Sequence, residues 1–242
     1  MRKIICLVLL AALIARAATA PSNLEAVKGA RQLLGRDVWS RVLEIENTGS
    51  TSLYPKITYA LVFEFNDILW FYTPHDGTQS LTLYANQLEH DKTHLQPMLT
   101  EIHKGFSRFR ALPEGAWDSV VGALPNGCFI ESVVALRELF ATGQRVLRAG
   151  VLLYYAKGDS RQGHAVLAYE TDAGVFIDDS ERARPEKIKG RWSERPLEIA
   201  RRHEPSLRKN LVAAKMVHIR VDGVSSRAYA SIDRSESSPK VG

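Results

Sequence analysis

The chain has 242 residues, of which 45% are hydrophobic and 24% charged. This composition supplies enough apolar side chains for a buried core and excludes a disordered or low-complexity polymer. The 32 Lys and Arg residues outnumber the 27 Asp and Glu residues, which gives a formal net charge of +5. One globular domain is expected, because the chain contains neither a long linker nor an internal repeat.

The first 20 residues predict a secretory signal peptide. Arg2 and Lys3 precede an apolar run from Ile4 to Ile14, and small residues follow it up to Ala20. The run is shorter than the ~20 residues that span a bilayer, so we expect a secreted or periplasmic protein without stable membrane insertion. Removing the signal leaves 29 Lys and Arg against 27 Asp and Glu, a net charge of +2. This near balance argues against nucleic acid as a partner.

The chain has 2 cysteines, Cys6 and Cys128, and they have different expected fates. Cys6 lies inside the apolar run of the signal peptide and is discarded with it. A lone Cys128 cannot close an internal disulfide, so it is a buried inert thiol, an intermolecular bridge or a reactive nucleophile.

A helix and then β structure are predicted for the N-terminal half. Asn23–Leu34 carries apolar side chains at helical spacing, and residues 41–46 form a short strand. Residues 57–84 alternate aromatic and β-branched runs with turn sequences, which predicts a three-stranded antiparallel meander. Residues 86–105 are predicted to be helical, with an interruption at Pro97.

Another helix and a sheet are predicted for the C-terminal half. In residues 127–142 apolar side chains recur at spacings of three and four, and Gly143 provides a stop signal, which predicts a helix. Residues 110–126 before it contain Gly, Pro and Trp and are predicted to be a loop. Strands are expected over residues 146–155, 164–170, 174–178 and 211–221.

Residues 21–222 are assigned to a single α+β domain. Within it, residues 181–209 carry ten Lys or Arg against five Glu, which is typical of a solvated, irregular or partly helical surface. Residues 223–242 are rich in Ser and charge and are predicted to be a disordered tail.

Three residues with reactive side chains occur in the order typical of a thiol enzyme. Cys128 opens a helix, His164 begins a strand and Asp178 ends the next strand. A free thiol ionises near pH 8.5, but a helix N-terminus and a neighbouring imidazolium stabilise the thiolate. We expect the acid to accept the Nδ1 proton of His164 and to orient the ring. Asp179 is the alternative third member, since adjacent strand residues point to opposite faces.

The residues before Cys128 predict an oxyanion site. Asn126 can cap the helix with its side-chain oxygen, and Gly127 lets a substrate backbone approach the sulfur. The first-turn amide of Cys128 would then point toward a developing oxyanion. Asn126 and Trp117 are further candidates for contact with the oxyanion or the substrate.

These segments resemble the papain-like superfamily in its transglutaminase-like branch, and most of all the bacterial transglutaminase-like cysteine peptidases. The resemblance covers residues 110–180, roughly, and rests on Gly127-Cys128, on the segment Gly163–Tyr169 and on Ile177-Asp178. It implies an α+β, papain-like or transglutaminase-like fold in which the cysteine helix packs on an antiparallel sheet.

The resemblance also implies the roles of the residues. Cys128 would be the nucleophile, His164 the base and Asp178 the third member of a Cys-His-Asp triad. Papain has a glutamine before its cysteine, whereas no glutamine occurs between Gln96 and Cys128 here. Trp117 and Asn126 are the candidates to replace it.

The implied function is an exported thiol-dependent acyl-transfer enzyme that acts on a protein or peptide without a cofactor. A thioester on Cys128 would pass to water, as in a peptidase or amidase, or to an amine, as in a transamidase. The alternative, favoured by the missing glutamine, is a non-catalytic exported binding module on the same fold.

A metal-dependent hydrolase is the third hypothesis. His90 and His94 lie four residues apart on a predicted helix, with His103 further along. Zinc peptidases have a glutamate directly after the first histidine, where this chain has Asp91. We therefore interpret these residues as a solvated helix face and predict no metal site.

Overall fold

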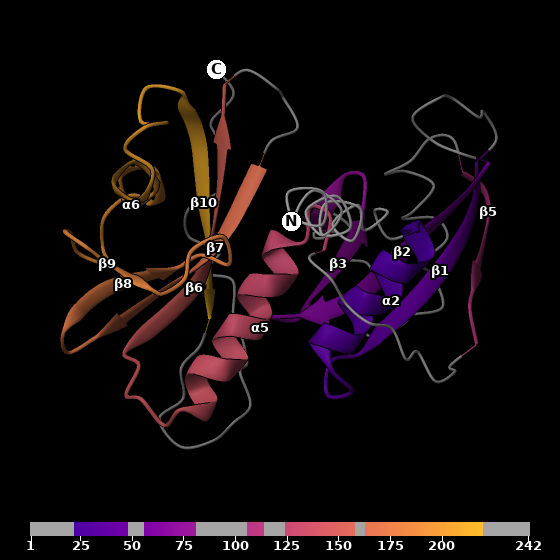
Figure 1. The fold of residues 1–242 in the computed structure, drawn as a ribbon, viewed down its shortest axis with the longest axis horizontal. Helices are drawn as coiled ribbons and strands as arrows, with labels where there is room; N and C mark the ends of the chain where they lie inside the picture. The colour runs from indigo at the N-terminus through magenta and orange to yellow at the C-terminus, as the bar shows by residue number, and fades with distance from the viewer. Residues whose placement is uncertain (1–21, 48–55, 81–105, 114–123, 158–162, 220–242) are drawn as a thin grey trace, which may run out of the picture.

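A computed structural model describes residues 22–47, 56–80, 106–113, 124–157 and 163–219. The fold is mixed α+β, as predicted, and contains two antiparallel five-stranded sheets. Figure 1 shows these sheets on either side of helix α5 (Cys128–Ala141).

The first sheet has the strand order β4-β3-β2-β1-β5. Its strands are β1 (Ser40–Asn47), β2 (Ile57–Phe65), β3 (Ile68–Thr73), β4 (Gly77–Ser80) and β5 (Phe106–Ala111). Strands β2 to β4 form the predicted meander, of which residues 81–84 lie outside the described residues. Asn66 and Asp67 make the β2–β3 turn with positive φ angles of 67° and 55°, which suits the twist of a hairpin.

The second sheet has the strand order β10-β6-β7-β8-β9. Its strands are β6 (Arg148–Ala156), β7 (Gly163–Thr171), β8 (Gly174–Asp178), β9 (Glu186–Ile188) and β10 (Leu211–Ile219). The four predicted strands of this half are confirmed, whereas the short β9 was not predicted.

Helix α5 packs between the two sheets and joins their cores. Phe129, the residue after Cys128, is buried against three aromatic rings of the first sheet, and its ring centroid lies 4.1 Å from that of Trp70. On its other side α5 packs on β7, whose Leu167 belongs to the same core. The cysteine helix thus packs on an antiparallel sheet, as expected.

Further contacts hold the layers together. The Asn66 amide donates to the carbonyl oxygen of His218 over 3.2 Å and so links the first sheet to β10. Helix α2 (Asn23–Leu34), which has the predicted bounds, is tied to α5 by Arg137. The Arg137 guanidinium donates to the carbonyl oxygens of Leu34 and Leu33, at 2.7 and 2.9 Å.

Helix α6 (Pro196–His203) covers the face of the second sheet that points away from α5, as Figure 1 shows. It lies in the charged segment for which an irregular or partly helical surface was predicted. Ile199 and Ala200 pack with buried strand residues such as Leu152 in a second core. Most of residues 181–209 are exposed and only part of the segment is helical, as predicted, while α6 buries one of its faces.

Several predicted features fall outside the described residues. They are the signal peptide at 1–20 with Cys6, the helical region 86–105 with His90, His94 and His103, the oxyanion candidate Trp117 and the tail at 223–242. In the part of the chain that the structure describes, none of the helices is both long enough and apolar enough to cross a membrane.

Candidate active site

Cys128 is the first residue of α5, and its side chain is partly buried. A tight turn leads into the helix, with the Gly127 N–H donating to the Leu124 carbonyl oxygen over 3.1 Å. A Cβ atom on Gly127 would lie 2.3 Å from the Leu124 Cβ, so only glycine fits this turn. Gly127 is the N-cap residue and has no side chain. It therefore has no side-chain oxygen that could accept a hydrogen bond from the first-turn N–H groups beside the thiol.

Asn126 does not cap the helix, contrary to the prediction. It adopts a left-handed conformation with φ 53°, and its side-chain amide donates to the carbonyl oxygens of Pro74 and His75, at 2.9 and 3.1 Å. Both amide protons are therefore engaged, so this group cannot donate to an oxyanion. Asn126 instead ties the loop before Cys128 to the β3–β4 turn.

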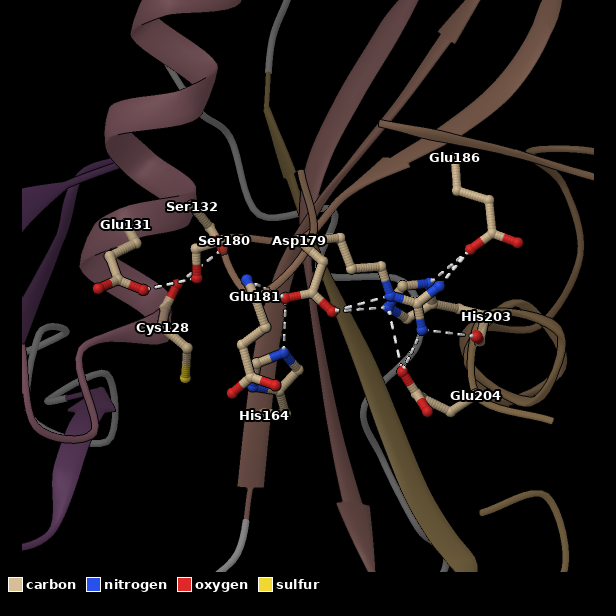
Figure 2. Close-up of polar contacts among 11 residues, drawn as sticks. Cys128, Glu131, Ser132, His164, Asp179, Ser180, Glu181, Glu186, His203 and Glu204 are labelled. Atoms are coloured by element: carbon tan, nitrogen blue, oxygen red, sulfur yellow. Dashed lines mark hydrogen bonds and ion pairs between the residues drawn. The ribbon is translucent and has the colours of Figure 1, made fainter. Parts of the chain in front are cut away.

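His164 lies near the start of β7, opposite Tyr154 of β6. Its Nε2 atom hydrogen-bonds Asp179 Oδ1 over 3.1 Å. In Figure 2 the Cys128 side chain extends from the first turn of α5 to the level of the His164 ring. Because Nε2 is engaged by the acid, Nδ1 is the nitrogen available to the thiol. The prediction that the acid would bind Nδ1 is wrong, because the acid binds Nε2 and Nδ1 is left for the thiol.

The acid beside His164 is Asp179, and the preference for Asp178 is wrong. Strands β7 and β8 pair with Leu167 opposite Asp178. Leu167 belongs to the core beneath α5, so Asp178 lies on that face. The next residue, Asp179, falls on the opposite face, which Val166 and His164 share.

The pKa of Asp178 agrees with this placement. Burial is the main cause that raises the pKa of Asp178, and the negative charges of Asp179 and of Glu138 on α5 raise it further. Asp178 thus faces the cysteine helix beside another acid, on the face of the sheet opposite the imidazole of His164.

Charge interactions favour an ionised pair of His164 and Asp179. Burial alone would lower the pKa of His164, but its interactions with Asp179 and Cys128 outweigh that effect and raise it to about 10. Burial would raise the pKa of Asp179, but hydrogen bonds from His164 and His203 hold it well below its ordinary value. The imidazolium form of His164 therefore predominates at neutral pH beside an ionised Asp179.

Two residues on the far side of Asp179 were not anticipated. His203 Nε2 hydrogen-bonds Asp179 Oδ2 over 3.1 Å, and the Arg182 Nε atom lies 3.7 Å from the same oxygen. His203 ends α6 and follows Ile199 by one helical turn, so its place on the buried face was visible in the spacing. The many charges of this segment concealed that signal.

A contact between α5 and the chain after β8 positions the two halves of the site. Ser180 Oγ donates to Glu131 Oε2 over 2.6 Å, and Glu131 lies in the first turn of α5. Because Ser180 follows Asp179 directly, this bond holds the acid's segment against the start of the cysteine helix (Figure 2).

Two groups of described side chains have a spacing that could suit a cation. They are His164, Asp179 and Glu181, and Asp179, His203 and Glu204, with ligand atoms within 4.8 Å of one another. Arg182 already pairs with Asp179 and Glu204, so a guanidinium takes the position of a cation in the second group. A metal in the first group would replace the bond between His164 and Asp179.

Comparisons of the chain with protein-family models, with curated proteins and with solved structures found no match.

Proposed function

We propose that the chain is an exported acyl-transfer enzyme of the transglutaminase-like or papain-like type, in which Cys128 is the nucleophile, His164 the base and Asp179 the orienting acid. The observation that carries this proposal is the series formed by a thiol at a helix start, an imidazole beside it and a buried carboxylate on the far ring nitrogen. The helix packed on an antiparallel sheet supports the same fold type.

The first chemical step is attack of the Cys128 thiolate on a carbonyl carbon of a protein or peptide. As the carbon–sulfur bond forms, the carbonyl oxygen takes the negative charge, which the first-turn amides of α5 stabilise. The tetrahedral intermediate then collapses, the carbon–nitrogen bond breaks, and the imidazolium of His164 gives its Nδ1 proton to the departing amine. A thioester on Cys128 remains.

The second step returns the enzyme to its starting state. Neutral His164 takes a proton from water or from an incoming amine, and the oxygen or nitrogen attacks the thioester carbon as the thiolate leaves. Water gives hydrolysis and an amine gives transamidation. Throughout, Asp179 keeps the ring in one orientation and stabilises its charged form. No cofactor takes part in these steps.

Alkylation by iodoacetamide near neutral pH tests the proposal. We expect rapid modification that peptide mapping places on Cys128 and that Cys128→Ser abolishes. His164→Ala should slow the reaction by about tenfold or more, because the positive charge beside the thiol is lost. A matched control is His218→Gln, which changes a histidine on β10 away from the site.

Two outcomes would contradict the proposal. The first is a thiol that reacts only when the protein unfolds, and the second is a native reaction rate that His164→Ala leaves unchanged. Either would favour the non-catalytic binding module.

A further inference from the structure

We infer that His203 is a positioning residue of the candidate active site, because it fixes the Asp179 carboxylate so that one oxygen faces His164. This inference rests on the proposed function. His203 would not touch the substrate or the thiol, and it would act through Asp179 alone.

The two carboxylate oxygens of Asp179 have different hydrogen-bond partners. Oδ1 accepts from His164 Nε2 and from the backbone N–H of Glu181, both over 3.1 Å. Oδ2 accepts from His203 Nε2 over 3.1 Å and lies 3.7 Å from Arg182 Nε. With donors on both oxygens, the carboxylate plane cannot turn without breaking a bond at each end.

Arg182 alone would not hold this orientation. Its guanidinium also donates to Glu204 over 2.6 Å, to the His203 carbonyl oxygen over 3.2 Å and to Glu186. Arg182 is therefore shared among several acceptors, and its contact with Asp179 is the longest of them. The bond from His203 is the short, direct one that keeps Oδ2 away from His164.

The burial of His203 supports a role beyond packing. The residue is 1% exposed, and its Nδ1 atom has no hydrogen-bond partner among the residues that the structure describes. A carboxylate oxygen, Glu186 Oε2, lies 3.8 Å from Nδ1. A buried imidazole with one unsatisfied nitrogen is costly for folding compared with an apolar side chain of similar size. What the histidine provides here, and leucine cannot, is the Nε2–H bond to Asp179.

The test uses the full chain and four variants: His203→Leu, His203→Gln, Asp179→Asn and the double variant His203→Leu/Asp179→Asn. One readout is the titration of the His164 ring by NMR, and the other is the rate of alkylation of Cys128 by iodoacetamide. Among the described residues, the groups beside His164 other than Asp179 are Cys128, Glu181 and Tyr154, and all are kept. His218→Gln serves as the control.

We expect His203→Leu to lower the His164 titration midpoint by about 1 pH unit and to slow alkylation about tenfold. His203→Gln, which can still offer an N–H to Oδ2, should recover most of both. In the Asp179→Asn background, His203→Leu should add less than about a twofold change, because the two residues act as a unit.

Three outcomes would overturn the inference: a folded His203→Leu variant with the wild-type titration, no recovery by glutamine, or effects that add in the double variant. If His203→Leu does not fold, His203→Met, which also lacks an N–H for Oδ2, replaces it, and a wild-type titration of His164 in that variant overturns the inference. The titration of His164 reports on positioning even if Cys128 proves unreactive, so failure of the inference and failure of the proposed function are distinguishable.

Discussion

Replacing Asp179 with asparagine removes one negative charge 3.1 Å from His164 Nε2 and leaves the size of the side chain almost unchanged. An opposite charge at this range raises the pKa of a histidine by about 1–3 units. Asp179 is only 2% exposed, so water screens the interaction little and the upper part of that range applies. We therefore expect Asp179→Asn to lower the pKa of His164 by about 2–3 units, which corresponds to ~3–4 kcal/mol.

The assay is an NMR titration of the histidine rings in the wild type, where the pKa of His164 is raised to about 10. The chain has 7 histidines, and the His164 signal is assigned by its absence in His164→Gln. The control is Asp178→Asn, which removes the neighbouring acid on the opposite face. A shift below about 0.5 units in Asp179→Asn, or an equal shift in Asp178→Asn, would refute the assignment of the acid.

Three further predictions concern stability. Phe129→Ala should lower the free energy of unfolding by about 3–5 kcal/mol in denaturant titrations, because it empties the core shared by the two sheets, and a loss below about 1 kcal/mol would contradict that packing. Gly127→Ala should cost about 1–3 kcal/mol and slow alkylation, since the new Cβ would lie 2.3 Å from Leu124; unchanged stability would show that the turn can relax. Folding raises the pKa of His164 from 6.5, so its contribution is complete below pH 6.5 and is lost as the pH rises toward 10. Folding lowers the pKa of Asp179 from 3.8, so its contribution to the free energy of unfolding is complete above pH 3.8 and is lost as the pH falls below that value. Denaturant titrations at different pH values should therefore find the greatest stability between pH 3.8 and 6.5. A stability minimum in that window would contradict the ion pair of His164 and Asp179.

Local signals account for the elements that the sequence predicted best. The helix Asn23–Leu34 has the predicted bounds because Ser22 caps it, with the Glu25 N–H donating to Ser22 Oγ over 3.3 Å, and Gly35 ends it. Strand β8 also has the predicted bounds, since a two-residue turn precedes it.

The identity of the acid was in principle available from the same hairpin. Thr171 pairs with Gly174 across the turn, and counting along both strands brings residue 179 opposite Val166, on the face of His164. Following the register would have selected Asp179, whereas the position of Asp178 at the end of the strand and the family resemblance selected Asp178. Strand parity was the stronger argument at this position.

Other parts could not be read from local patterns. Strand β5 lies at the edge of the first sheet beside β1, and its exposed Arg108 and Arg110 interrupt the apolar pattern of a strand. Arg110 pairs with Glu44 of β1 over 2.8 Å, a partner distant in sequence. The contact of His203 with Asp179 likewise depends on the packing of α6 against the second sheet, which no local pattern predicts.

The shared position of α5 has a consequence for how the chain opens. Phe129 fills the core of the first sheet while the same helix covers β7, so neither sheet can separate without exposing the helix that begins with Cys128. Amide hydrogens in α5 should therefore exchange with deuterium only through global unfolding, at the slow limit for the molecule. A fragment of residues 110–180, roughly, would lack the aromatic rings of the first sheet and would leave Phe129 in water. We therefore expect that these residues, on which the predicted family resemblance rests, do not fold on their own and aggregate when excised.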